Sequence, residues 1–321
     1  MDAEKFAKAL KGLKGPTLVT FHSLGDIDAV GGAFALKTLI PNSEVRASGG
    51  VGAGARRLLE KLHIPLPKQM SKSDFSRFGS IVLVDVGNPD LLGEFGGEFK
   101  GFAGTLAVVD HHYHSNNLKA GHSLIERDAS SSCEIVHELL EAAGVEIGEN
   151  EALLLLAGIL ADSAFFKSAR KRTFHSFSRL LQKTSSDYPS ILDLAMPRRD
   201  VSEKIARLRC VQSAKFERAG EFVVGHSLSS AFELSCASAL VECGCDAAFV
   251  ANPKEGRMSG AKRSALRGVN VGKLMETAGR AMGGSGGGHE NVGGARGRKE
   301  AVQKALERIV KLAVRKLKMG A

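Results

Sequence analysis

Apolar positions in the first half of the chain alternate between short continuous runs and longer periodic segments. The short runs predict buried strands, at residues 17–21, 44–48, 81–85, 105–110 and 122–126. The periodic segments predict helices, near residues 29–39, 55–62, 130–144 and 149–166. Strands that are apolar throughout are typical of parallel sheets covered on both faces. The first half is therefore predicted to be a parallel α/β domain.

The pattern changes near residues 188–200, where "DYPSILDLAMPRRD" combines two prolines with several charges. Beyond it we expect strands at 221–227, 246–253 and 256–261, and helices near 230–242, 271–281 and 299–318. A glycine-rich loop is expected between the last two helices, over residues 283–297. The predicted organisation is a first domain over 1–187, a linker region over 188–212 and a smaller α/β domain over 213–321.

Composition narrows the class of protein. The chain is 43% hydrophobic and 25% charged, as in soluble globular proteins, and we find no membrane-length apolar run or apolar signal core. A cytoplasmic protein is expected. The odd number of cysteines, five, without a C-x-x-C pair predicts reduced thiols. The net charge of +9 favours a polyanionic partner such as nucleic acid or a nucleotide.

Acidic and histidine residues gather where the predicted elements end. They are His22, Asp26 and Asp28 after the first strand, Asp85 after the third, Asp110, His111 and His112 after the fourth, and Asp162 near the end of the apolar helix. The carboxyl ends of parallel strands open onto one crevice, so strand direction brings three of these four clusters to the same edge.

So many carboxylates in one crevice repel each other unless cations hold them. Oxygen and imidazole ligands together suit Mn²⁺ or Mg²⁺ better than a thiolate-bound zinc. The number of ligands is sufficient for two metals that share a carboxylate, an arrangement that activates water for phosphoryl displacement.

Each residue also has an ordinary structural role when it is taken alone. Asp28 could cap the following helix, Asp85 could cap a turn, and a single histidine at 111 or 112 could be structural. Asp162 fits least well, because an unpaired carboxylate in an apolar helix costs several kcal/mol. Purely structural roles need independent coincidences at four places, so a metal site is the better interpretation.

These residues resemble the four motifs of the DHH phosphoesterase superfamily. The motifs are "HSLGDIDA" from His22, then Asp85, "DHH" at 110–112 and "ADS" around Asp162. The segment "GGSGGGHENVGG" resembles the glycine signature of the DHH-associated C-terminal domain. Gly25 and Ile27 depart from the usual proline and glycine, and "NVGGA" departs from the usual ending. The resemblance implies an N-terminal DHH domain, a smaller substrate-binding domain and an active site in the cleft between them.

The resemblance also implies roles for individual residues. One metal would be held by His22, Asp26 and Asp85, and a second by Asp28, Asp85, His111 and Asp162, with Asp85 bridging. Asp110 would orient a ligand histidine, and His112 would stabilise or protonate oxygens at the scissile phosphate. Mn²⁺ is the expected ion, with Mg²⁺ and Co²⁺ as alternatives.

Candidate substrate contacts lie in the second domain. Consecutive glycines at 286, 287 and 288 could cradle an anion with their N–H groups, although such runs are often flexible linkers. By resemblance, His289 would reach the substrate phosphate. The basic segment "GRMSGAKRS" adds candidate phosphate contacts in Arg257, Ser259, Lys262 and Arg263. The basic helix 299–318 is interpreted as a solvated face over an apolar stripe.

The expected protein is similar to the RecJ-like and nanoRNase branch of the superfamily. It would hydrolyse phosphodiester bonds in short single-stranded RNA or DNA, as an exonuclease using metal-activated water. Few aromatic residues, with Tyr113 and Tyr188 as the only tyrosines and no tryptophan, argue against a long single-strand track. The alternatives are a phosphatase of 3′-phosphoadenosine 5′-phosphate, another nucleotide phosphoesterase, or an inactive nucleic-acid-binding module. A homodimer is left open.

Overall fold

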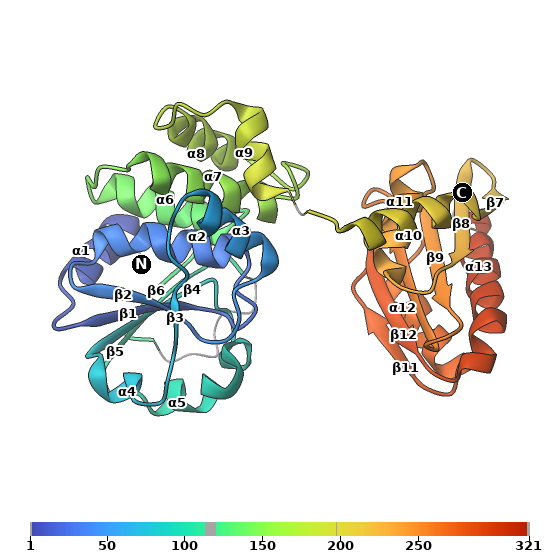
Figure 1. Cartoon of the computed structure of the whole chain (residues 1–321), viewed down its shortest axis with the longest axis horizontal. Helices are drawn as coiled ribbons and strands as arrows, with labels where there is room; N and C mark the ends of the chain where they lie inside the picture. The colour runs from blue at the N-terminus through green and yellow to red at the C-terminus, as the bar shows by residue number, and fades with distance from the viewer. Residues whose placement is uncertain (1, 113–119, 197, 320–321) are drawn as a thin grey trace. The chain divides into compact units, whose positions relative to one another are not determined.

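A computed structural model describes residues 2–112, 120–196 and 198–319 of the chain, so Tyr113 lies outside the described residues. The chain divides into two compact units, unit 1 over residues 1–198 and unit 2 over residues 199–321 (Figure 1). Within the described residues no helix is both long and apolar enough to cross a membrane.

Unit 1 is built on a six-stranded sheet in which every neighbouring pair is parallel, in the order β3-β2-β1-β4-β5-β6. The strands are β1 (Thr17–Phe21), β2 (Ser43–Ala47), β3 (Lys68–Gln69), β4 (Ser80–Val84), β5 (Thr105–Asp110) and β6 (His122–Ile125). The parallel sheet predicted from the apolar runs is confirmed. The two-residue edge strand β3 was not predicted, because both of its residues are polar and exposed.

Both faces of this sheet are covered, as the continuous apolar strands predict. Val19 and Phe21 point into a core shared with α1 (Ala3–Lys11), α2 (Ile27–Leu36), α3 (Ala53–Lys61), α6 (Ser132–Ala142) and α7 (Glu149–Asp162). Leu18 and Leu83 belong to a second core, with phenylalanines of α4 (Asp74–Arg77), η2 (Pro89–Phe95) and α5 (Gly96–Gly101). Figure 1 shows α4 and α5 on the face of the sheet opposite α2 and α6. A short η1 (Lys37–Leu39) extends α2.

Helices α2 and α7 approach each other closely because glycines line their contact. A Cβ on Gly31 would lie 2.8 Å from the carbonyl oxygen of Leu154. A Cβ on Gly158 would lie 2.3 Å from Cys133 Sγ and 3.1 Å from Asp28 Oδ1. Helix α7 is buried from Ala152 to Leu160, and Gly158 lets its backbone pack closely beside Asp28.

The segment 188–212, expected to be a linker region, contains two helices. The first, α9 (Tyr188–Ala195), follows α8 (Lys171–Leu181) and buries Ile191 in the core of unit 1. The second, α10 (Val201–Gln212), belongs to unit 2 and buries Cys210. Pro189 starts α9 instead of breaking it, because proline is tolerated in the first turn of a helix.

Unit 2 is built on a mixed sheet in the order β11-β12-β10-β9-β8-β7, in which β8 and β9 are parallel and the other neighbours antiparallel. The strands are β7 (Lys215–Ala219), β8 (Phe222–Leu228), β9 (Ala247–Asn252), β10 (Arg257–Lys262), β11 (Ser285–Gly288) and β12 (Val292–Arg296). Helices α12 (Val271–Ala281) and α13 (Val302–Met319, after η3, Lys299–Ala301) share one core with the sheet. Helices α10 and α11 (Glu233–Glu242) share another core. The predicted smaller α/β second domain is confirmed.

The glycine-rich segment is a β-hairpin, so the expectation of a loop over 283–297 is wrong. Its strands β11 and β12 pair antiparallel, with Gly287 opposite Gly294. A Cβ on Gly286 would lie 2.1 Å from the carbonyl oxygen of Met275 in α12. Glycine is needed here because the strand packs directly on a helix backbone. The loop was predicted from glycine content alone, which does not reveal this packing.

All five cysteines are free thiols, as predicted. Cys243 is exposed and the other four are buried.

The close packing at Gly158 yields a stability prediction. Gly158→Ala forces Cys133 and the Asp28 carboxylate to move, so we expect unfolding of unit 1 to be easier by about 1–3 kcal/mol. Urea denaturation of the full chain, followed by circular dichroism, measures this change.

Gly97→Ala is the matched control, because Gly97 lies in helix α5 and nothing lies within 4 Å of its added Cβ. It should be neutral or stabilising by about 0.5–1 kcal/mol. Equal effects of the two substitutions would contradict the close-packing argument.

Candidate metal centre

The carboxyl ends of β1, β4 and β5 bring the predicted ligands together at one edge of the unit 1 sheet. Three groups of residues place one ligand atom each within 4.8 Å of one another. The groups are His22, Asp26 and Asp85; Asp28, His111 and Asp162; and Asp85, His111 and His112. Asp162 reaches them from the last residue of α7.

Asp85 stands between the first two groups. Its Oδ2 lies 3.4 Å from His22 Nε2, and its Oδ1 lies 3.4 Å from His111 Nε2. The side chain is buried, and the residue directly follows β4 with a positive φ of 60°. Aspartate tolerates this left-handed conformation better than most residues do. One carboxylate thus offers a separate oxygen to each group.

Asp28 is held by the first turn of helix α6. Its Oδ2 accepts a hydrogen bond from the Ser132 N–H at 2.7 Å, and its Oδ1 accepts one from the Cys133 N–H at 2.9 Å. The positive end of the helix dipole favours a carboxylate at this position. The expectation that Asp28 could cap its own helix is not what the structure shows, since Asp26 caps α2 by accepting from the Ala29 N–H.

Ser132 contacts both groups, and the sequence interpretation missed it. Besides its N–H bond to Asp28, its hydroxyl donates to Asp85 Oδ1 at 2.9 Å. The neighbouring Ser131 has a different role, since it caps α6 by accepting from the Glu134 N–H. One sequence feature could have indicated Ser132. It is a polar residue at the N-terminus of a helix, and this helix follows a strand whose end lies at the same edge of the sheet as the ligands.

Asp110 orients His112, whereas a ligand histidine was expected as its partner. The Asp110 carboxylate is fully buried, and its Oδ1 lies 2.8 Å from His112 Nδ1. It contacts His111 only through the backbone, accepting from the His111 N–H at 2.9 Å. The His112 side chain is half exposed. The buried Asp110 therefore fixes a histidine ring that solvent or substrate can reach.

The crowding perturbs the protonation of the cluster. Burial would lower the pKa of His22, but the Asp26 and Asp85 carboxylates raise it to about 10. Burial and the charges of Asp85 and Asp162 raise the pKa of Asp28 well above its usual range. Burial, opposed by His111, raises the pKa of Asp162 to about 6. Protons thus offset the repulsion in the absence of a cation, and a cation would take over that role by displacing them.

The geometry of these side chains fits divalent metal ions better than direct hydrogen bonds. His111 Nε2 is buried and has no hydrogen-bond partner among the described residues, although Asp162 Oδ2 is 3.2 Å away. The distances of 3.2–3.5 Å between these nitrogens and oxygens are longer than those of charge-assisted hydrogen bonds. They are close to the spacing of about 3 Å between adjacent ligands of a six-coordinate ion.

Unit 2 holds a pocket of about 360 Å³ that contains some of the predicted substrate contacts. Arg257, Ser259 and Gly286 line it, together with Arg296 and Ser285, which the sequence interpretation missed. Arg257 lies directly opposite Arg296 on neighbouring antiparallel strands. Glu233 also lines the pocket and lies 3.4 Å from Arg257, so it offsets one of the two charges. The pocket keeps an excess of positive charge, which favours an anion. Only the strand pairing, absent from the sequence interpretation, brings Arg296 to this place.

Other predicted contacts lie elsewhere in unit 2. Lys262 Nζ is buried against Glu290 Oε1 at 3.0 Å, and Arg263 pairs with Asp246 at 2.6 Å. Both cations form ion pairs, and neither lines the pocket that contains Arg257. Neither His289 nor Gly287 or Gly288 lines the pocket. The carbonyl of His289 accepts from the Gly272 N–H at 2.9 Å, which anchors α12 to the hairpin turn.

Comparisons with known proteins agree with this architecture. An uncharacterized protein of Methanocaldococcus jannaschii is 30% identical over 288 residues, which cover 85% of this chain and 84% of that protein. An exopolyphosphatase-related protein from Bacteroides fragilis superposes with a TM-score of 0.75 at 16% identity, covering 98% of this chain and 97% of its own. RecJ from Thermus thermophilus, solved with Mn²⁺, gives a TM-score of 0.51 at 14% identity, covering 98% of this chain and 55% of its own.

Family models match both units of the chain. Residues 16–159 match the model of the DHH family N-terminal domain, and residues 240–315 match the model of the DHHA1 domain. The first match contains the strands and most of the acidic and histidine residues of the candidate metal centre, and the second contains the glycine-rich hairpin. The resemblance inferred from the motifs is confirmed, and the chain belongs to the DHH family of phosphoesterases, with a C-terminal DHHA1 domain.

Proposed function

We propose that this protein hydrolyses phosphodiester bonds in short single-stranded oligonucleotides with the help of two divalent metal ions. The observation that carries the proposal is the position of Asp85, whose two oxygens lie 3.4 Å from histidines of two separate groups. A carboxylate shared in this way is the expected bridge of a two-metal site for phosphoryl displacement. His22 and Asp26 would complete one site, and Asp28, His111 and Asp162 the other.

The ions would lower the pKa of a bound water and neutralise charge on the phosphate oxygens. Side chains of this chain would supply the proton transfer and further charge stabilisation. Asp110 raises the pKa of His112 through the bond to Nδ1, which favours the protonated form of the ring. An imidazolium held by a buried carboxylate can stabilise charge on the reacting phosphate and give a proton to the leaving oxygen. His112 is therefore proposed as the general acid.

Unit 2 is proposed to bind the substrate's phosphate groups. Arg257 and Arg296 occupy opposite positions on paired strands and both line the pocket, where Glu233 lies 3.4 Å from Arg257. Ser259 and Ser285 add hydroxyl donors. Guanidinium groups match phosphate geometry and do so without any need for a specific base. Mn²⁺ is the proposed ion, in line with the RecJ neighbour solved with Mn²⁺.

The activity prediction compares substrates directly. The purified full chain with Mn²⁺ is given 5′-labelled dinucleotides, longer RNA and DNA strands, and 3′-phosphoadenosine 5′-phosphate. Release of mononucleotides from the short oligomers is the expected result. Phosphate release from the adenosine compound alone would replace this proposal with a nucleotide phosphatase.

Asp85→Asn should lower kcat by about 10²- to 10³-fold or more, because one oxygen of the bridge loses its charge. Asp90→Asn is the matched control, since Asp90 is a nearby exposed aspartate outside the cluster. If wild type and Asp85→Asn were equally inactive on every substrate with Mn²⁺, Mg²⁺ and Co²⁺, the protein would be a binding module.

A further prediction concerns Ser132, which would act through the metal ligands Asp28 and Asp85. Ser132→Ala removes the hydroxyl bond to Asp85 but keeps both backbone N–H bonds to Asp28, and should weaken Mn²⁺ binding by about 10- to 100-fold. Ser132→Thr keeps a hydroxyl and should restore most of the affinity. Electron paramagnetic resonance of free Mn²⁺ measures the binding.

Ser131→Ala serves as the control for the Ser132 variant. It removes the cap bond to the Glu134 N–H and should cost about 1 kcal/mol of stability, with a much smaller effect on Mn²⁺ affinity. Equal losses of Mn²⁺ affinity in both variants would show that helix placement, not the Ser132 hydroxyl, sets the affinity.

Another prediction concerns the arginine pair, Arg257 and Arg296. Arg296→Gln should raise KM by about tenfold with a smaller change in kcat, because it removes one charge-assisted phosphate contact. Lys299→Gln removes the same charge from an exposed position outside the pocket and should leave KM unchanged. An unaltered KM in Arg296→Gln would remove the pocket from the proposed substrate path.

A further inference from the structure

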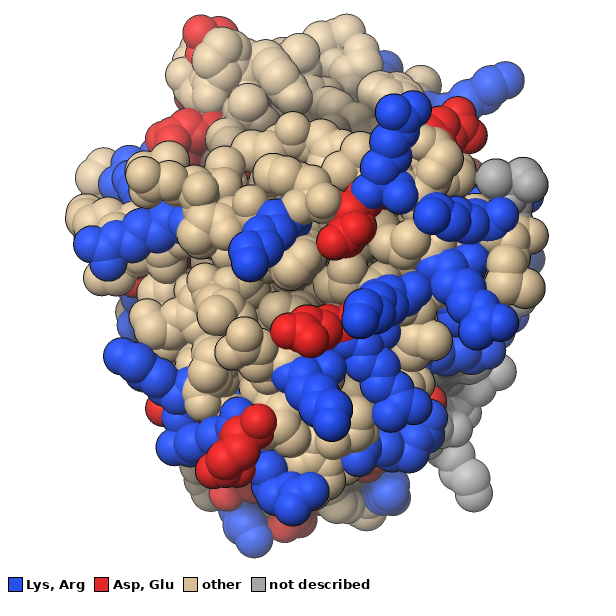
Figure 2. Space-filling model, turned by 90° about the vertical axis from the view of Figure 1, so that its right-hand side faces the viewer, with Lys and Arg blue, Asp and Glu red and all other residues tan. Residues whose placement is uncertain are grey.

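The excess of positive over negative charge lies in unit 2. Residues 199–321 contain 22 lysines and arginines against 12 aspartates and glutamates, a net charge of +10. Residues 1–198 contain 22 against 23, a net charge of −1. On the side of unit 2 that faces the viewer in Figure 2, blue side chains are far more frequent than red ones (Figure 2). The phosphate pocket accounts for only two of these cations, Arg257 and Arg296.

Helix α13 carries a straight stripe of cations on its exposed face. The stripe consists of five residues spaced alternately four and three apart, Lys304, Arg308, Lys311, Arg315 and Lys318. This spacing keeps side chains on one face of an α-helix and makes a row about 21 Å long. All five are exposed, and none forms an ion pair with another described residue. The stripe is therefore open to a polyanion from solution.

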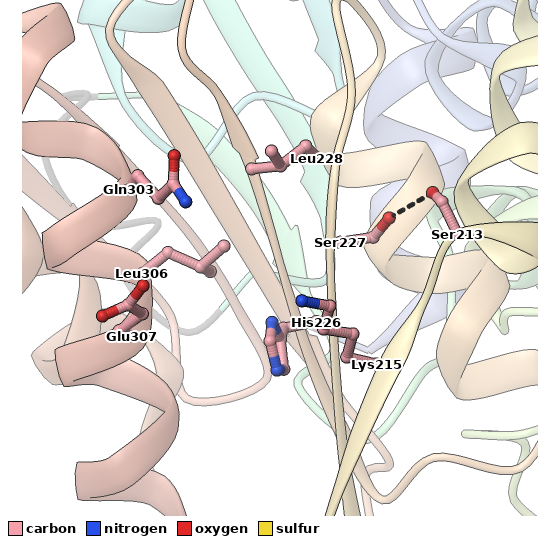
Figure 3. A pocket seen from close by; sticks show the side chains of 8 residues that line it. All are labelled: Ser213, Lys215, His226, Ser227, Leu228, Gln303, Leu306 and Glu307. Carbon is pink, nitrogen blue, oxygen red and sulfur yellow. Dashed lines mark hydrogen bonds between the residues drawn. The ribbon is translucent and has the colours of Figure 1, made fainter.

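A hollow lies beside this stripe, between α13 and the hairpin of β7 and β8. Its larger part has a volume of about 430 Å³, and Lys311, Arg315 and Lys318 of the stripe line it together with the apolar Val310 and Val314. A smaller part of about 190 Å³ continues past His226 to Leu306 and Leu228 (Figure 3). His226 and Glu307 line both parts. The volume is that of a small-ligand pocket with an apolar wall and a cationic rim.

The amphipathic pattern of α13 could also belong to a membrane-surface helix or to a merely solvated one, and the structure weakens both roles. A membrane-surface helix would need its apolar face, but Leu306, Ile309 and Ala313 are buried in the core of unit 2. A merely solvated face would usually mix both signs of charge, whereas α13 has six cations and one anion, Glu307. Glu217 and Glu307 do line the hollow, so the phosphates belong on the stripe and an uncharged group in the hollow.

We propose that the α13 stripe and the hollow beside it form a second nucleic-acid site, which lies within unit 2 and binds single-stranded nucleic acid. Phosphates lie along the cations of α13, and an unpaired base enters the hollow against His226 and the valines. Charge complementarity favours a polyanion, and a base-sized hollow beside the stripe favours a single strand over a duplex. The site would retain a strand independently of hydrolysis, so its existence does not depend on the proposed activity.

The test uses the full-length protein in EDTA, which prevents metal-dependent cleavage. Fluorescence anisotropy follows a fluorescein-labelled oligouridylate, about 20 nucleotides long, across a series of salt concentrations. The variant Arg308→Gln/Lys311→Gln/Arg315→Gln should bind at least about tenfold more weakly at low salt. Its slope of log affinity against log salt should be smaller by about two, since each phosphate contact of a single strand contributes about 0.7.

The control variant, Lys8→Gln/Lys100→Gln/Lys183→Gln, removes the same charge from exposed lysines of unit 1 and should stay within about twofold of wild type. Equal affinities of the two triple variants would overturn the proposal, because net charge alone would then explain binding. Tighter binding to a duplex of the same length would overturn the single-strand assignment. Loss of phosphatidylserine vesicle binding in the α13 variant, with RNA binding unchanged, would make the stripe a lipid surface.

Discussion

The structure depends on holding four carboxylates close together before any cation has arrived. Asp28 is buried and receives the backbone N–H groups of Ser132 and Cys133, and Asp85 receives the Ser132 hydroxyl. These bonds come from one helix N-terminus, where the helix dipole lowers the cost of negative charge. The rest of unit 1 serves to bring that helix end to the carboxyl edge of the sheet. A metal site with its ligands already in place binds with less loss of conformational entropy.

Close helix packing extends this arrangement to the remaining ligand, Asp162. Helix α7 lies against α2 through glycine contacts, and Gly158 sits beside both Cys133 and Asp28. Asp162 follows Gly158 by four residues, about one turn, so it lies on the same face of α7 and near the same carboxylates. A larger residue at 158 would separate the helices and move Asp162 away from His111. The close packing of the helices at Gly158 therefore also determines where the candidate ligand Asp162 lies.

The sequence predicts the parts of the fold that follow from periodicity and the ligands that follow from strand direction. His22, Asp85 and His111 could be placed together because parallel strands deliver their ends to one edge. Ser132 could not be found in this way, because its function depends on where a helix points and not on its residue type. Arg296 was not predicted as a pocket residue for a similar reason. It lies opposite Arg257 only because the glycine-rich segment forms a hairpin that pairs with β10. Composition favours a loop there, but the backbone of α12 favours a flat strand without side chains.

The two units differ in charge, and this difference affects how each of them interacts with phosphate groups. A substrate rich in phosphate meets repulsion from the carboxylates of unit 1 unless cations lie between them, and this repulsion falls when metals bind. Unit 2 has no such conflict, because its net charge of +10 attracts phosphate without any metal. Lysines and arginines placed among the carboxylates of the candidate metal centre would form ion pairs with them, and the division of charge between the two units avoids this. In this arrangement the lysines and arginines of unit 2 are available to phosphate groups, while the aspartates of unit 1 are available to metal ions.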